Sequence, residues 1–264
     1  MKRTLILVAV VLFVLPAPRP AQALEVAEVV AKANHAAYYQ GKDGRATVHM
    51  SIVDSEGRER TRDFVILRLD VDDKSDTEQK FFVFFRRPAD VSKTTFMVWK
   101  HPGKGDDRWM YLPALDLVKR IAASDERTSF MGSHFFYEDV SGRSPDEDNH
   151  ELTETTDNYY VLKSTPKDPT QVEFASYRTW VHKTTFLPIK SEFYDDNNKV
   201  YRTYEALKVD TVSGFPTITK SRMSDNRING ETTVEYKNVK YDLSLPDEIF
   251  TERYLRNAPR KYLR

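Results

Sequence analysis

The chain has 264 residues, with 40 lysine and arginine side chains against 40 aspartate and glutamate side chains, and it contains no cysteine. This balanced charge excludes a strong electrostatic attraction to nucleic acid or to an anionic membrane surface. The lack of cysteine excludes disulfide bonds and thiol nucleophiles, so a buried core must supply the stability.

Residues 1–23 have the three parts of a secretory signal peptide. Lys2 and Arg3 give a positive start, residues 4–15 are almost purely apolar, and Ala21-Gln22-Ala23 has the small-x-small pattern of a cleavage site. We expect cleavage after Ala23 and a soluble periplasmic protein of residues 24–264. The signal holds three basic and no acidic side chains, so the mature chain has a net charge of −3. An uncleaved membrane anchor is the alternative.

The remaining sequence begins with one predicted helix and continues with many predicted strands. Residues 25–40 have apolar side chains at spacings of three and four, which indicates a helix that ends at Gly41 to Gly44. From Arg45 the apolar period changes to two. The predicted strands are 45–54, 59–69, 79–87, 94–100, 107–112, 117–121, 151–154, 159–164, 174–182, 188–194, 200–212, 216–224 and 232–239.

Two segments lack this alternation. Residues 124–145 read as a loop with a short helical turn, and residues 246–255 predict a short helix anchored by apolar and aromatic side chains. We find no low-complexity linker and expect one domain, 24–264. A long antiparallel meander must curl or split into two sheets to hide its apolar faces, and the helices make the predicted fold class α+β.

Catalytic and metal-binding motifs are lacking in the sequence. It contains no nucleophile elbow, metalloprotease helix, nucleotide-binding loop or dinucleotide fingerprint. The six histidines are scattered, and the acidic run 146–151 lacks the glycine and the distal glutamate of a calcium loop. We therefore predict no enzyme, no cofactor and no tight metal site, and interpret the acidic run as a solvated turn.

The aromatic clusters are the most informative feature. Residues 81–85, 96–99 and 108–112 are apolar on both strand faces, although a sheet with one wet face should alternate. Either both faces are covered, or one face lines an apolar cavity beside the ring-rich loop 130–137. The predicted cavity residues are Phe82, Phe84, Met97, Trp99, Trp109 and Tyr111, and the predicted lid residues are Phe130, Met131, Phe135 and Phe136. A one-residue error in register would exchange the two faces.

Several blocks of sequence resemble the exported outer membrane lipoprotein-sorting protein family. They are 108–115, 118–121, 129–133, 137–139, 187–190 and 192–195, and the resemblance runs over most of the mature chain. That family is similar in fold to the lipoprotein carriers LolA and LolB and to the sensor RseB. The resemblance implies an incomplete antiparallel β-barrel of about eleven strands, closed by short helices around a cavity for acyl chains.

The predicted function is that of a periplasmic carrier. It would bind the acyl chains of a lipoprotein or another lipid and pass them toward the outer membrane through an inner- or outer-membrane partner. The alternative is an envelope sensor or adaptor of the same fold that binds a membrane protein and carries no lipid. In the carrier hypothesis, loop 124–145 is the candidate lid and the terminal helix a second one.

Overall fold

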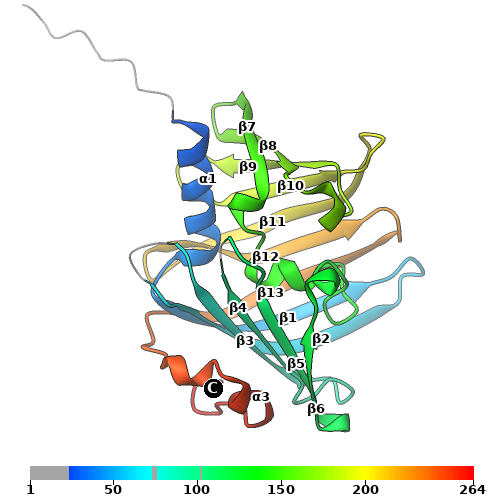
Figure 1. Ribbon diagram of the computed structural model, residues 1–264, viewed down its shortest axis with the longest axis vertical. Helices are drawn as coiled ribbons and strands as arrows, with labels where there is room; N and C mark the ends of the chain where they lie inside the picture. The colour runs from blue at the N-terminus through cyan, green and yellow to red at the C-terminus, as the bar shows by residue number, and fades with distance from the viewer. Residues whose placement is uncertain (1–23, 73–75, 102) are drawn as a thin grey trace, which may run out of the picture.

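The computed structural model describes residues 24–264 except 73–75 and 102, and the predicted signal peptide lies outside the described residues. All thirteen strands form one antiparallel sheet in the order β6-β5-β4-β3-β2-β1-β13-β12-β11-β10-β9-β8-β7 (Figure 1). Strands β6 and β7 are the two free edges, so the sheet curls but does not close. The strands are β1 Asp43–Val53, β2 Glu59–Asp70, β3 Gln79–Arg87, β4 Thr95–Lys100, β5 Asp107–Leu112, β6 Leu117–Ile121, β7 Asp148–Thr155, β8 Tyr159–Pro166, β9 Ser176–His182, β10 Pro188–Tyr194, β11 Val200–Val212, β12 Phe215–Asp225 and β13 Gly230–Tyr241.

The α+β, open-barrel prediction is confirmed, and the strand number refines it. Alternation along the sequence predicts thirteen strands, whereas the family resemblance implies about eleven. The structure has thirteen. Strand β7 is longer than predicted because Asp148, at its start, belongs to the sheet and is buried.

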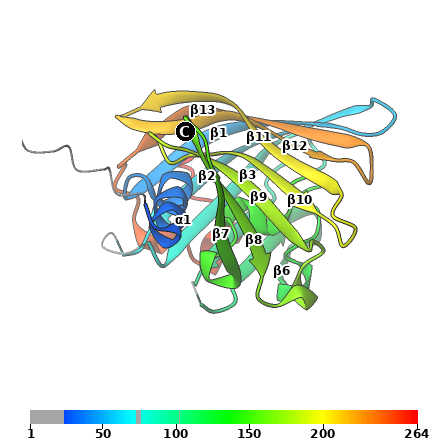
Figure 2. The same cartoon turned by 90° about the horizontal axis from the view of Figure 1, so that it is seen from above.

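Helices occupy the concave side of the sheet at two places. Helix α1 (Val26–Asn34) continues as the π-helical turn η1 (His35–Tyr39), and Figure 2 shows the sheet curving around it. Helix α2 (Tyr137–Ser141) lies in the segment that joins β6 to β7. Because β6 and β7 are opposite edges, this segment must cross the open side. The segment also contains the short helices η3 Ala123–Asp125 and η4 Pro145–Glu147, and η2 Pro113–Leu115 lies between β5 and β6.

The C-terminal segment, residues 243–263, lies on the convex face. It contains η6 (Asp247–Ile249) and α3 (Glu252–Arg256), and Figure 1 shows it against β3, β4 and β5. The indole of Trp99 donates to the Phe250 carbonyl at 2.7 Å, and the Thr95 hydroxyl donates to the Leu255 carbonyl at 2.8 Å. The remaining short helix, η5, spans Pro169–Gln171.

Two apolar clusters therefore sandwich strands β2 to β5. On the concave side, Phe81, Val83 and Phe85 pack with Phe96 and Val98 against the lid segment. On the convex side, the alternate residues of the same strands pack against the C-terminal segment. This double packing explains why these strands are apolar on both faces.

Candidate functional site

A cavity lies between the concave face of the sheet, helix α1 and the α2 segment. Its volume is about 440 Å³, which falls within the range of ligand-binding pockets. One side of the cavity is apolar. It is lined from β1, β2, β3 and β13 by Ala46, Met50, Phe64, Ile66, Phe81, Val83 and Val234.

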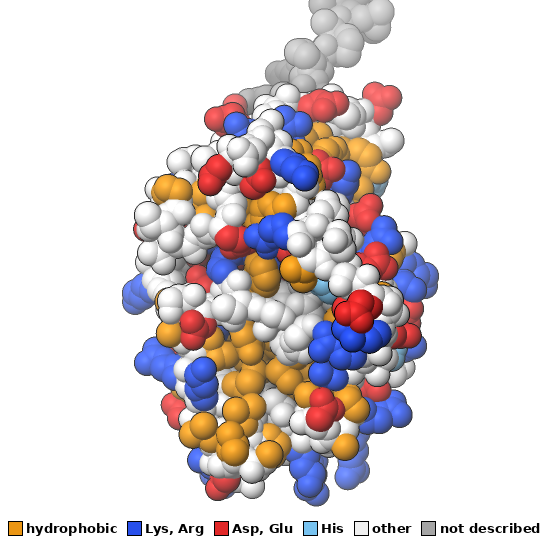
Figure 3. Space-filling model, turned by 90° about the vertical axis from the view of Figure 1, so that its right-hand side faces the viewer, with side chains coloured by type: hydrophobic (Ala, Val, Ile, Leu, Met, Phe, Trp, Pro, Cys, Tyr) orange, Lys and Arg blue, Asp and Glu red, His pale blue; other side chains and the backbone are white. Residues whose placement is uncertain are grey.

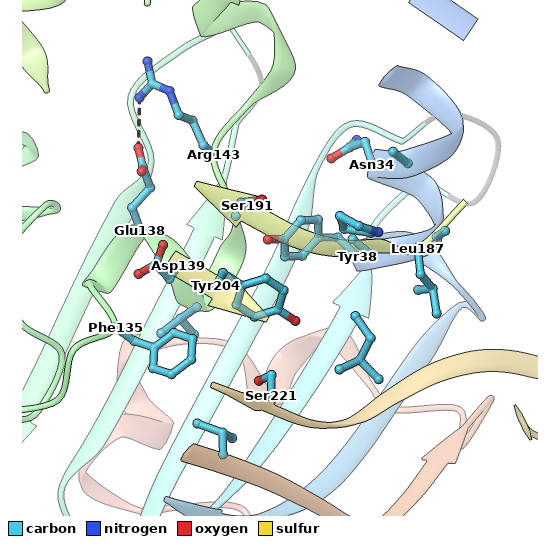
Figure 4. Close-up of a pocket in the computed structure, with 18 of the residues that line it drawn as sticks. Asn34, Tyr38, Phe135, Glu138, Asp139, Arg143, Leu187, Ser191, Tyr204 and Ser221 are labelled. Atoms are coloured by element: carbon cyan, nitrogen blue, oxygen red, sulfur yellow. Dashed lines mark hydrogen bonds and ion pairs between the residues drawn. The ribbon is translucent and has the colours of Figure 1, made fainter. Parts of the chain in front are cut away.

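The other side of the cavity carries hydroxyl groups. Small residues of β8 to β12 contribute Ser164, Thr179, Ser191 and Ser221, and the phenols of Tyr38, Tyr177, Tyr204 and Tyr236 also line the space. Figure 4 shows Tyr38 and Tyr204 with Asp139, Ser191 and Ser221 around the same pocket. The first side of the cavity is thus apolar, whereas the second mixes hydroxyl groups with apolar side chains such as Leu162, Val181 and Phe193.

We define the lid as residues 122–147, the segment between β6 and β7. Its chain folds back on itself through the bridge between Ser129 and Phe136 and the hydrogen bond from the Phe130 amide to the Phe135 carbonyl at 2.8 Å. The Asp139 carboxylate caps α2 by accepting from the Phe136 amide at 2.6 Å. This local folding brings α2 over the mouth of the curled sheet.

Buried cations hold the lid to the sheet. Arg202 of β11 is 0% exposed, pairs with Asp139 and donates to the His134 carbonyl at 3.0 Å. Lys100 of β4 donates to the Ser141 and Gly142 carbonyls at 2.9 and 2.7 Å. Burial lowers the pKa of Lys100 to about 8, so its ammonium is held at a desolvation cost.

A second group of ion pairs lies within the lid and beside it. Glu138 is buried and pairs with both Arg127 and Arg143, the latter at 3.1 Å. Arg127 also binds Glu173 through two nitrogens at 2.6 and 2.8 Å, and Arg143 binds Asp148 at 3.0 Å. Asp148 therefore serves a buried ion pair, which corrects its interpretation as part of a solvated turn.

The predicted cavity residues do not line the cavity. Phe82, Phe84, Met97, Trp99, Trp109 and Tyr111 all lie on the convex face, within or against the cluster covered by the C-terminal segment. The cavity takes their sequence neighbours Phe81 and Val83 instead. The six residues share one strand parity and all belong to the opposite face, as a one-residue error in register would produce. The terminal helix covers this convex face, so it is not a second lid.

The four predicted lid residues differ in what they contact. Phe130 and Phe135 line the cavity, but Phe130 is only 2% exposed and its ring lies 5.4 Å from that of Phe96, so it is part of the core. Met131 packs against the same cluster. The Phe136 ring lies under the guanidinium of Arg202, 4.0 Å from its centroid.

Comparisons with known proteins agree with this architecture. A protein-family model described as "Uncharacterized protein" matches residues 77–257, more than half of the chain. The chain belongs to that family. No curated protein matches the sequence.

Solved structures extend the comparison to nearly the whole described chain. A DUF1329 family protein from Desulfovibrio piger is 28% identical, with a TM-score of 0.79, and the match covers 86% of this chain and 96% of that one. A Vibrio parahaemolyticus structure that carries the name outer membrane lipoprotein-sorting protein domain is 25% identical, with a TM-score of 0.78, covering 88% and 98%. The LolA superfamily protein NE2245 from Nitrosomonas europaea shares the fold at 21% identity and a TM-score of 0.66, covering 88% and 100%. The resemblance to lipoprotein-sorting proteins and the LolA-like fold are thereby confirmed.

The polar side of this LolA-like cavity was missed by sequence reasoning. Tyr38, Tyr204 and Tyr236 come from η1, β11 and β13, and in the sequence Tyr38 follows two alanines whereas Tyr204 and Tyr236 stand among polar neighbours. A usable signal existed in β13, where alternation from the apolar Val234 places Tyr236 on the same face. No group of histidine, aspartate and glutamate suited to a metal ion occurs in the described residues. No helix among them has the length and apolarity to cross a membrane.

Proposed function

We propose that the protein is a periplasmic carrier that holds an acyl chain of a lipoprotein or another lipid in the cavity under the lid. The observation that carries the proposal is the apolar wall from Ala46 to Val234, enclosed by the α2 segment in a cavity of about 440 Å³. The similarity to a structure named for lipoprotein sorting supports the same reading.

The energetics favour an enclosed site. Each buried methylene contributes roughly 0.8 kcal/mol, so a palmitoyl chain costs on the order of 10 kcal/mol to expose to water. The protein sequence has no nucleotide-binding motif. Transfer of the lipid would therefore run toward a membrane partner of higher affinity, with any energy supplied by that partner.

The lid is held in a way that permits release. Its contacts with the sheet at Asp139, Ser141 and Gly142 are polar, made to Arg202 and Lys100. Tyr137 and Val140 of α2 add partly buried apolar contacts with the concave cluster. When the lid opens, water can form new hydrogen bonds with the polar groups that separate. Water offers no such compensation to the exposed ring of Phe130, because exposing apolar surface is unfavourable. The part that opens would therefore be the α2 side of the lid, with Phe130 kept as an anchor in the core.

Direct binding of a palmitoyl chain carrying a fluorophore tests the proposal. All three tryptophans of the chain, Trp99, Trp109 and Trp180, are absent from the cavity wall, so intrinsic fluorescence is a poor reporter and a labelled ligand is needed. We expect saturable binding by the delipidated mature protein. Mass spectrometry of lipids that co-purify from the periplasm identifies the natural cargo.

Two matched serine substitutions control the experiment. Ser191→Phe inserts a ring into the cavity from β10 and should weaken probe binding at least tenfold. Ser51→Phe places the same ring on the convex side of β1, where Ser51 bonds Glu59 at 2.6 Å, and should leave binding unchanged. Equal affinity of both variants, or no saturable binding by the parent protein, would refute the carrier function.

A further inference from the structure

Three phenols converge on one part of the cavity. Tyr38 comes from η1, Tyr204 from β11 and Tyr236 from β13, and all three line the cavity. Figure 4 shows Tyr38 and Tyr204 in the same part of the pocket as Asp139 of α2 and Ser221 of β12. Among the hydrogen bonds of the described residues, none involves the hydroxyl of Tyr38 or Tyr236, and Ser221 is a polar neighbour of Tyr204.

These phenols are hydrogen-bond donors at any physiological pH. Burial, followed by the nearby Asp139 carboxylate, raises the pKa of Tyr236 to about 12 and shifts the pKa of Tyr38 upward as well. Burial and the neighbouring phenols do the same for Tyr204. A neutral phenol keeps its proton and can give it to an acceptor on a ligand.

The charges around the phenols do not suit an anionic ligand. Asp139 and Glu138 are close, and their cationic partners, Arg202 and Arg127, are already engaged in ion pairs with them. The ammonium of Lys100 lies 5.4 Å from the centroid of the Tyr38 ring, but it already donates to the carbonyls of Ser141 and Gly142. Burial, and after it the nearby carboxylates, disfavour an ionised phenol here and would also disfavour a ligand carboxylate. A neutral acceptor, such as an ester or amide carbonyl, meets no such penalty.

We propose that the phenol cluster of Tyr38, Tyr204 and Tyr236 binds the ester or amide carbonyl of a neutral acylated ligand, whose hydrocarbon chain lies along the apolar wall. This inference rests on the carrier function and specifies the ligand class. The neutral acyl ester has its polar end at the cluster and its chain against Phe81, Val83 and Val234.

An anionic ligand would use a different part of the cavity. Arg68 lines it, donates through Nη2 to the Gln40 and Gly41 carbonyls at 2.5 and 2.7 Å, and keeps Nη1 buried without a partner. Burial lowers the pKa of Arg68, so its charge is held at a cost. A free fatty acid would find its cation at Arg68 rather than at the phenols, which makes the two ligand classes separable by substitution.

Competition against the fluorescent palmitoyl probe separates these classes. For the delipidated mature protein, we expect monopalmitoylglycerol to compete more strongly than palmitate. Tyr38→Phe and Tyr236→Phe should each weaken monopalmitoylglycerol roughly fivefold, the effect of losing one neutral hydrogen bond of about 1 kcal/mol, and leave palmitate unchanged. Tyr194→Phe removes a phenol that bonds Glu192 and does not line the cavity, so it should change neither ligand.

The outcomes distinguish this inference from the carrier function. Stronger competition by palmitate, abolished in Arg68→Met, would overturn the neutral-ester inference and leave an acyl carrier. Unchanged affinity for monopalmitoylglycerol in both phenylalanine variants would overturn it as well. Failure of the probe itself to bind would refute the carrier function and the inference together.

Discussion

Replacing Arg202 by methionine tests whether the lid is docked in solution. The Arg202 guanidinium is fully buried, pairs with Asp139, donates to the His134 carbonyl and stacks on Phe136. Breaking a buried ion pair by removing one partner costs about 3–5 kcal/mol, because it leaves the other charge without compensation. The Asp139 side chain is 18% exposed, so water moderates the loss. We expect a decrease of about 3 kcal/mol in the free energy of unfolding.

Urea unfolding followed by circular dichroism measures this effect, read as a shift in midpoint at constant slope. Arg222→Met is the matched control, since Arg222 on β12 pairs with Glu205 at 2.7 Å but is 35% exposed, and should cost less than about 1 kcal/mol. Adding Asp139→Asn to Arg202→Met removes the orphaned charge and keeps the cap on Phe136, so it should restore part of the loss. If both arginine variants cost the same small amount, Asp139 is solvated and the lid is open in solution.

Three further predictions concern the pH dependence, the fit of the lid and the convex face. Burial raises the pKa of Asp70, which is 5% exposed, to about 6. The native state thus holds this proton more tightly than the unfolded state, and the stabilisation present below about pH 4 is lost as the pH rises through 6. The free energy of unfolding should therefore fall by about 2 kcal/mol between pH 4 and pH 7, and Asp70→Asn should abolish this change. Gly142 has φ +77°, and a Cβ there would lie 2.3 Å from the Tyr38 ring, whereas Gly57 has the same φ with nothing within 4 Å. Gly57→Ala should lower the free energy of unfolding by about the 1–2 kcal/mol expected of backbone strain alone. Gly142→Ala should lower it by more and should make the lid more sensitive to proteolysis. Equal losses in the two variants would mean that the lid does not contact η1. Phe82→Ala should lower the free energy of unfolding by about 3–5 kcal/mol, because Phe82 is 0% exposed, yet leave probe affinity unchanged in the folded protein.

The sequence predicts the strands well because most of them alternate. In β1, the buried residues Ala46, Val48, Met50 and Ile52 fall at every second position, and this fixes both the strand and its inward face. Alternation alone also yields thirteen strands, which is closer to the structure than the number implied by the family resemblance. Local patterning therefore carries most of the information about the sheet.

The face of β3 to β5 could not be predicted because these strands have no polar side to exclude. Phe82 and Phe81 are both buried, one against the C-terminal segment and the other toward the lid. The deciding contacts join residues far apart in sequence, such as Trp99 and Phe250. No local pattern records these contacts, so the sequence does not determine which face of each strand lines the cavity. The lack of an apolar period does place residues 124–145 outside the strands.

The two halves of the sheet play different structural parts. Strands β2 to β5 are packed on both faces, so contacts within the protein hold them in place without a ligand. Strands β8 to β12 present hydroxyl-bearing side chains such as Ser191 and Ser221 to the cavity, and no described segment covers their convex face as residues 243–263 cover that of β3 to β5. Exposed apolar side chains occur at the β5–β6 hairpin, where Leu115 and Leu117 are 70% and 46% exposed, and Figure 3 shows hydrophobic surface in the corresponding lower part of the molecule. A ligand seated between the rigid apolar half and the polar half would complete the core on the concave side, so binding and lid docking should stabilise each other.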